Sequence, residues 1–233
     1  MKNLFNLDNP FMQAMARIGD LMILSVLTLV LCLPVVTFGP AVTALFKTVY
    51  SLTLDTCGGT IVTYFRAFKQ SFKQSCIVGI AMLIALAAFA CDVILLRLYY
   101  EGRGYQVLLA FVAILVLLVM CLTAYMFPLI SRYNNTLSEH LHNAAILTIM
   151  HFPKTVLLVL VHLSPLLMFY FRAEFMLQTL VVWIFLAPGL IAQADSYILK
   201  PIFEQLEKNK EDAEKAGSEY GEDSAYDNGD KTP

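Results

Sequence analysis

Long stretches without a charged residue constrain this chain more than any other feature. Four of them contain no Asp, Glu, Lys or Arg, and a fifth contains only Asp92. The five stretches are Leu21–Phe46, Tyr105–Ser131, Thr155–Phe171, Phe175–Ala194 and Cys76–Leu96. A helix that crosses a bilayer needs about 20 mostly apolar residues, within a range of about 17–25. The stretches therefore predict a helical protein embedded in a membrane.

The overall composition also favours a membrane protein over a soluble one. Hydrophobic residues make up 58% of the 233 residues, charged residues make up 15%, and the mean hydropathy is +0.68. An average soluble domain carries about 25% charged residues. The alternative, a soluble all-α protein with very long buried helices, would have too few charges to cover its surface. The expected fold class is all-α, a polytopic bundle of transmembrane helices in a lipid bilayer, and no nucleic-acid partner is expected.

About five membrane spans are predicted. They cover approximately Ile18–Phe38, Cys76–Leu96, Val107–Phe127, Pro153–Phe171 and Phe175–Ala194. With their connectors they form a predicted integral membrane domain of residues 1–206. The remaining segment, 207–233, holds nine acidic residues, four lysines and almost no aliphatic residue, so it cannot bury enough apolar surface to fold. It is predicted to be an acidic, disordered cytoplasmic tail.

The connector between the first two spans contains a segment with helical periodicity, Ile61–Ser75. Large apolar residues recur on one face of that helix: Ile61, Phe65, Phe68 and Phe72. Cations lie on a neighbouring face: Arg66, Lys69 and Lys73. Apolar side chains next to cations that extend towards water are typical of a helix lying in the membrane interface. An ordinary solvated helix is the alternative interpretation.

Two breaks interrupt the first apolar stretch. Pro34 removes a helix hydrogen bond, while Gly39-Pro40 can turn the chain and start a new helix with proline in its first turn. Ala41–Leu54 is then a possible half-helix that re-enters the membrane, with Lys47 near its middle reaching for water or a carboxylate. Broken segments of this kind are tolerated where they are buried in protein or line a wet cavity. Otherwise the segment lies on the cytoplasmic surface.

The distribution of Lys and Arg predicts the orientation, because short cytoplasmic loops are enriched in both. With five spans and counting as far as Lys215, ten cations lie on the side of the tail and five on the side of the N-terminus. If the half-helix enters the membrane, the N-terminus with Lys2 joins the side of the tail, and the counts become eleven against three. Both interpretations place the tail in the cytoplasm and leave the side of the N-terminus open.

Four segments around the first three predicted spans stand out as motifs. They read NPFMQAMARIGDLMIL, CLPVVTFGPAVTAL, YFRAFKQSFKQS and FPLISRYNNTLSEHLHNAAIL. Together they resemble the YesL-like family, a family of bacterial multi-pass membrane proteins of unknown function. The resemblance implies a bacterial inner membrane and a genomic neighbourhood of carbohydrate-uptake and polysaccharide-degradation genes. It supplies no catalytic residue, and the acidic tail lies outside it.

Three ionisable residues are candidates for an intramembrane polar site: His162, Lys47 and Asp92. His162 lies near the middle of the fourth predicted span, at a depth where ionisable residues are expensive and face the bundle interior. A neutral histidine that donates one hydrogen bond between helices is the alternative. Asp92 lies five residues from Arg97 near the end of the second span, where a plain ion pair is the simplest interpretation.

No metal, cofactor or catalytic site is predicted. His140 and His142 point to different sides of a helix, and His140 and His151 share a face but lie about 16 Å apart along it. The five cysteines show neither the spacing of a metal site nor a disulfide framework.

Three classes of function fit these observations. The first is an accessory or regulatory membrane protein that works beside a carbohydrate uptake system, with membrane subunits of that system as partners. The second is a small solute transporter in its own right, suggested by His162 and by the prolines that interrupt most spans. The third, an intramembrane enzyme, is disfavoured because no nucleophile–base constellation is visible. We therefore expect a protein that is not an enzyme.

Overall fold

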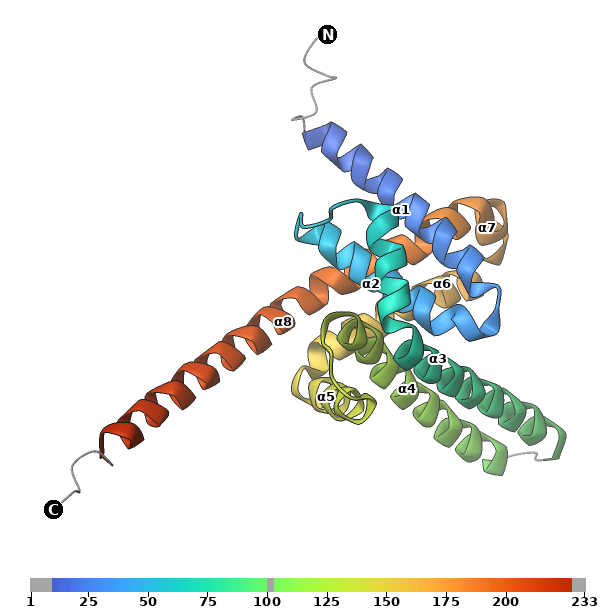
Figure 1. The fold of residues 1–233 in the computed structure, drawn as a ribbon. Coiled ribbons are helices and arrows are strands. Elements are labelled where there is room, and N and C mark those ends of the chain that lie inside the picture. Colours follow the sequence, from blue (N-terminus) through green and yellow to red (C-terminus); the bar gives the residue numbers. More distant parts are fainter. Residues whose placement is uncertain (1–9, 100–102, 228–233) are drawn as a thin grey trace, which may run out of the picture. The chain divides into compact units, whose positions relative to one another are not determined.

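The structure is a computed structural model that describes residues 10–99 and 103–227, so Lys2 lies outside the described part. Within these ranges the chain forms eight α-helices, one short 3-10 helix and no strand (Figure 1). The α-helices are α1 (Pro10–Cys32), α2 (Phe38–Thr53), α3 (Thr60–Tyr99), α4 (Arg103–Arg132), α5 (Leu137–Met150), α6 (Phe152–Phe171), α7 (Ala173–Gln178) and α8 (Leu180–Asp227). The predicted all-α fold class is confirmed.

Six helical segments in the described ranges are long and apolar enough to cross a membrane. Five of them correspond to the predicted spans and lie in α1, α3, α4, α6 and α8. The sixth, Val35–Thr53, contains the predicted half-helix except its last residue, Leu54. Large apolar side chains are exposed along these helices; Ile84, Ile114 and Leu166 are each more than 60% exposed. Such a surface matches lipid and not water, because monomeric soluble proteins rarely expose long apolar stripes.

The predicted break in the first apolar stretch is present, and it comes earlier than the predicted end at Phe38. Helix α1 ends at Cys32, and Pro34 precedes the 3-10 helix η1 (Val35–Thr37) in an extended conformation. The Thr37 hydroxyl makes hydrogen bonds with the carbonyl oxygens of Leu31 and Pro34. The bond to Leu31 satisfies a carbonyl group that the end of α1 leaves without a partner.

Helix α2 is the most deeply buried of the candidate spans. Half of its span is buried inside the protein, against 22% or less of each other span. It packs against α1, α3 and α4. Since the other helices present most of their surface outward, α2 forms the centre of the bundle.

The contact between α2 and α3 uses small residues and hydroxyl groups. Tyr64, Ala67, Ser71 and Ser75 lie on the buried face of α3. The Tyr64 hydroxyl donates to the Ala41 carbonyl oxygen at 3.1 Å. The Thr43 hydroxyl donates to the Ser75 hydroxyl at 2.8 Å. Small residues let helix backbones approach closely, and interhelical hydrogen bonds stabilise such contacts in membranes.

The amphipathic connector is not a separate interfacial helix, which corrects the prediction. It forms the first part of α3, which continues without interruption from Thr60 to Tyr99. No proline occurs within this helix, so nothing in the sequence forces a break between the connector and the span. Forty residues extend about 60 Å, twice the hydrocarbon thickness of about 30 Å. One end of α3 therefore extends well beyond the membrane core.

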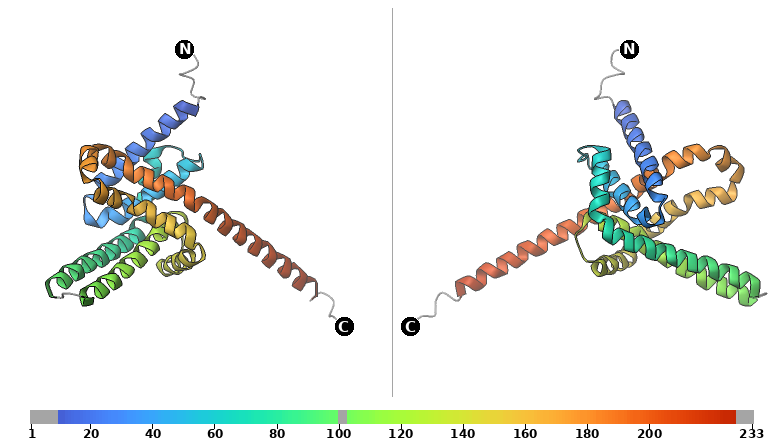
Figure 2. Two further views of the ribbon diagram at one scale, coloured as in Figure 1. Left: turned by 180° about the vertical axis from the view of Figure 1, so that it is seen from behind. Right: turned by 45° about the vertical axis from the view of Figure 1, so that its right-hand side comes forward.

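Helices α3 and α4 form one hairpin, helices α6 and α8 form a second, and α5 connects the two. Helices α3 and α4 run side by side, as both views of Figure 2 show. The connector helix α5 begins with a capping box, in which Thr136 and Glu139 each bond the backbone of the other. This pairing satisfies two donors at the start of the helix. The short helix α7 lies in the turn between α6 and α8.

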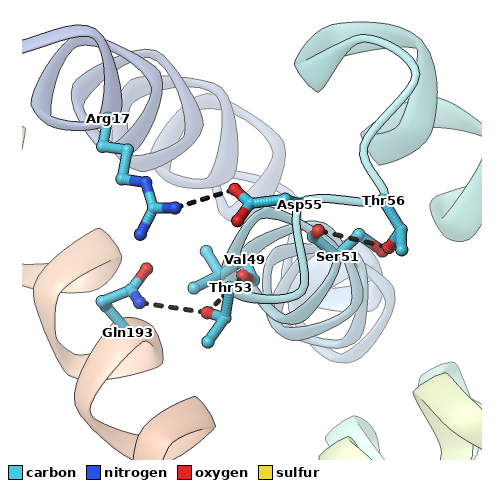
Figure 3. A network of polar contacts seen from close by, with 7 residues as sticks. All are labelled: Arg17, Val49, Ser51, Thr53, Asp55, Thr56 and Gln193. Carbon is cyan, nitrogen blue, oxygen red and sulfur yellow. Dashed lines mark hydrogen bonds and ion pairs between the residues drawn. The ribbon is translucent and has the colours of Figure 1, made fainter. Parts of the chain in front are cut away.

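Polar contacts at the end of α2 connect it to α1 and α8 (Figure 3). Arg17 Nη2 of α1 donates to Asp55 Oδ1 at 2.7 Å. Gln193 Nε2 of α8 donates to Thr53 Oγ1 at 3.0 Å, and the Thr53 hydroxyl donates to the Val49 carbonyl oxygen. These contacts join segments far apart in the sequence, so they fix where the turn after α2 lies.

The chain divides into two compact units, Met1–Ser196 and Tyr197–Pro233. Helix α8 continues to Asp227, so the described part of the predicted tail, residues 207–227, is helical. Helix-forming residues and pairs such as Glu211 and Lys215 at i,i+4 favour this conformation locally. The disorder of the tail stays a prediction, as does the domain boundary at residue 206.

Candidate functional site

A half-open cavity of about 420 Å³ lies among the helices of the first unit. Residues from six helices line it: α1, α2, α3, α4, α6 and α8. The lining is almost wholly apolar and includes Phe38 and Phe127, whose rings meet edge to face with centroids 6.5 Å apart. The side chains that bring nitrogen or oxygen atoms to the lining are Thr28, Thr123 and His162. The cavity is therefore an apolar space with one ionisable nitrogen group at its wall.

His162 is oriented by its own helix. Its Nδ1 atom lies 3.0 Å from the Leu158 carbonyl oxygen, one turn earlier in α6. A carbonyl oxygen only accepts, so Nδ1 carries a proton and donates it. The other ring nitrogen, Nε2, lies 3.5 Å from Asp195 Oδ2 of α8. His162 thus lines the cavity and contacts an acid on another helix.

Asp195 is a deeply buried acid next to His162. Its side chain is 1% exposed, and neither carboxylate oxygen has a hydrogen-bond partner among the described residues. The predicted last span ended at Ala194, one residue too early, so sequence reasoning missed Asp195. The available signal was an acid directly after a long apolar stretch, where an ionisable residue is a functional candidate by default.

A proton on either group makes the 3.5 Å contact between His162 Nε2 and Asp195 Oδ2 favourable. Because Nδ1 already donates to Leu158, the Nε2 atom and the carboxylate can approach each other favourably only with a proton on one of them. The pair is then either an imidazolium beside a carboxylate or a neutral imidazole beside a carboxylic acid. Both forms carry no net charge, which limits the cost of burying an acid at this depth.

Lys47 and Asp92, the other two candidates from the sequence, do not join His162. Lys47 is half-buried on α2, and its Nζ donates to Gln70 Oε1 of α3 at 3.1 Å. The partner is a neutral amide, whereas water or a carboxylate was predicted. Asp92 is exposed on α3 and forms no ion pair with Arg97.

The predicted basic face is exposed at all three positions, Arg66, Lys69 and Lys73. The apolar side chains of Phe65 and Phe72 beside it are also exposed, at 41% and 37%. Helix α3 packs against α2 through a different face, so both predicted faces are available to lipid and water. This arrangement is compatible with contact at the membrane interface.

The connector histidines His140, His142 and His151 lie in α5 or at its end. Among the described residues, no three His, Cys, Asp or Glu side chains come close enough to hold one ion. His140 is fully buried in α5, and neither ring nitrogen makes a hydrogen bond within the described part of the chain. Burial lowers the pKa of His140, an effect that the charge of Glu139 and the backbone of Tyr133 partly offset. Burial and the charge of Lys154 lower the pKa of His151.

Comparison with known proteins gives one family match. No curated protein and no solved structure matches the chain. Residues 21–93 match the model of a family described as "Protein of unknown function, DUF624". The matched segment covers the second half of α1, the whole of α2 and most of α3, including the buried face of α3 described above. Residues 21–93 are thus similar to this family of unknown function, and the six candidate spans of the described residues are those of a multi-pass membrane protein.

Proposed function

We propose that this protein is an accessory or regulatory protein of the bacterial inner membrane that works beside a carbohydrate uptake system without carrying carbohydrate itself. The link to carbohydrate uptake comes from the resemblance to the YesL-like family. The expected partners are membrane subunits of that uptake system. A catalytic role is not part of the proposal.

The apolar lining of the central cavity carries this proposal. A sugar presents several hydroxyl groups, each of which needs a hydrogen-bond partner when it leaves water. An unsatisfied hydroxyl group costs about 1–3 kcal/mol on burial. Thr28, Thr123 and His162 are too few to satisfy a sugar, and His162 already contacts Leu158 and Asp195. The central cavity therefore supports a role other than carrying carbohydrate.

The proposal also includes the orientation of the protein in the membrane. If all six candidate spans cross, the N-terminus, the turn at 54–59, the α5 connector and the tail share one side. That side holds eleven of the cations counted above, so we assign it to the cytoplasm. The basic face of α3 then lies at the cytoplasmic surface, where it is available to a partner subunit or to anionic lipid.

A paired experiment tests the accessory function. The purified protein, reconstituted alone in vesicles, should take up no labelled mono- or disaccharide above the level of empty vesicles. Co-expressed with the membrane subunits of the uptake system encoded beside its gene, it should co-purify with them in mild detergent. Uptake by the protein alone would overturn the proposal.

Transport of another solute is the second candidate function. The observation that favours it is the His162–Asp195 pair, because intramembrane ionisable groups commonly mark substrate or proton paths. An apolar solute would suit the cavity better than a sugar. Vesicle uptake assays with apolar solutes, with and without a proton gradient, separate this candidate from the first.

A further inference from the structure

We propose that the central cavity binds a lipophilic monovalent cation and that the bound cation replaces the proton held between His162 and Asp195. This assigns a ligand class to the cavity and is independent of any partner in carbohydrate uptake. The inference rests on the shape of the cavity, its apolar lining and the charge balance of the pair behind its wall.

The cavity has a suitable size and surface for such a ligand. Its volume of about 420 Å³ falls within the range of about 300–1,000 Å³ that small-molecule sites occupy. Aromatic side chains contribute to the lining, including Phe38, Phe46 and Phe127. Aromatic faces attract cations, and apolar walls favour a ligand whose charge is shielded by hydrocarbon groups.

Charge complementarity selects a cation over a neutral or anionic ligand. No Asp, Glu, Lys or Arg lines the cavity itself, and Cys32 and His162 are its titratable lining groups. Asp195 is nine-tenths or more buried, makes no hydrogen bond in the described ranges, and has His162 Nε2 at 3.5 Å from its Oδ2 atom. With the proton gone, the pair carries one negative charge directly behind the wall formed by His162.

The charged groups on the neighbouring helices are engaged elsewhere. Arg17 of α1 pairs with Asp55, and Lys47 of α2 donates to Gln70. Arg132 of α4 lies over the Tyr50 ring, with its guanidinium carbon 4.5 Å from the ring centroid. The charge of Lys154 of α6 lowers the pKa of His151. Among the described residues, His162 is therefore the ionisable partner that the structure gives Asp195.

The exchange balances in charge and in protons. The protonated pair and the free cation carry one positive charge together. After binding, the cation lies in the cavity next to His162, the imidazole is neutral, the Asp195 carboxylate behind it is ionised, and one proton has passed to water. An unpaired charge in an apolar site is costly, so cation and proton should compete for the same carboxylate.

Binding of tetraphenylphosphonium to the purified full chain in detergent tests the inference. The wild-type protein should bind this cation and release about one proton per cation in weakly buffered solution. Uncharged triphenylphosphine oxide should bind at least tenfold more weakly and release no proton. Asp195→Asn should weaken cation binding at least tenfold and abolish proton release.

Asp92→Asn is the matched control, because Asp92 is also an acid within a candidate span but is exposed on α3. It should bind the cation as the wild type does. Absence of cation binding by the wild-type protein, binding without proton release, or equal loss in both Asn variants would overturn the inference. If Asp195→Asn fails to fold, the comparison of charged and uncharged probes and the proton release of the wild type still decide it.

Discussion

Gly39, in the first turn of α2, lies in backbone contact with Gly79 of α3. A β-carbon at Gly79 would lie 2.8 Å from both the nitrogen and the α-carbon of Gly39. A β-carbon at Gly39 would overlap the Ser75 carbonyl group. The two helices can approach this closely only because both positions lack a side chain. This contact anchors α2, the most buried span, immediately after the break at Pro34.

Replacing either glycine by alanine should therefore destabilise the protein. The added methyl group would meet backbone atoms, which cannot rotate away, so the helices must separate. Overpacking typically costs about 1–3 kcal/mol, and contact with rigid backbone belongs at the upper end of that range. The measurement is the thermal midpoint and the yield of monodisperse protein in detergent for Gly39→Ala and Gly79→Ala.

Gly19→Ala is the control for this prediction. Gly19 also lies in a helix, but no atom lies within 4 Å of the position its β-carbon would take. Since alanine is favoured over glycine inside helices by about 1 kcal/mol, this variant should be as stable as the wild type or more so. Equal behaviour of all three variants would mean that the close approach of α2 and α3 is absent.

The sequence predicted the break after α1 because proline and Gly-Pro act locally, through the backbone. The apolar stretches likewise predicted the helices, since the length needed to cross a bilayer depends on composition alone. The helical continuity of α3 was missed because a change from basic to apolar composition looks like a boundary, although no residue between Thr60 and Tyr99 breaks the helix. The composition of a segment predicts whether it lies in lipid or in water, whereas a helix ends where residues such as proline interrupt its backbone hydrogen bonds.

Replacing Lys47 should cost less stability than breaking a buried ion pair does. Its partner, Gln70, is a side-chain amide that can turn and offer its NH₂ group in place of its oxygen. Lys47→Glu can therefore still be hydrogen-bonded, and its cost should stay near that of Lys47→Leu, at about 1 kcal/mol. A double-mutant cycle with Gln70→Ala measures the interaction through detergent stability. A cost of several kcal/mol confined to Lys47→Glu would show that a carboxylate also faces this lysine.

The pairing of His162 with Asp195 illustrates what sequence alone could not provide. His162 was singled out from its depth in a span, but its partner comes from a helix 33 residues later in the sequence, beyond the predicted end of the last span. Which residues meet depends on how the helices pack. The same holds for the cavity, because its lining is assembled from six helices and no single segment encodes it.

His140 should make the protein less stable in acid. Its pKa is lowered in the fold from an ordinary value of 6.5, so the unfolded chain binds the proton more readily. Stability is therefore lost as the pH falls through 6.5 towards the folded pKa. His140→Met should reduce the fall in thermal midpoint between pH 7.5 and pH 5.5. His142 is exposed, so the His142→Met variant should keep the whole fall in thermal midpoint. The pKa of His151 is also lowered, so His151 should maintain part of that fall in both variants.

The side of the N-terminus distinguishes six crossings from five. If α2 crosses the membrane, Phe11 and Ser218 lie on the same side, opposite to Gly104 in the first turn of α4. With the native cysteines replaced, single cysteines at these three positions can be exposed to an impermeant thiol reagent in intact cells. We expect labelling at position 104 and protection at 11 and 218, because eleven cations lie on the side assigned to the cytoplasm. Labelling at 11 and 104 with protection at 218 would mean that α2 does not cross. Labelling at 218 with protection at 104 would invert the whole arrangement.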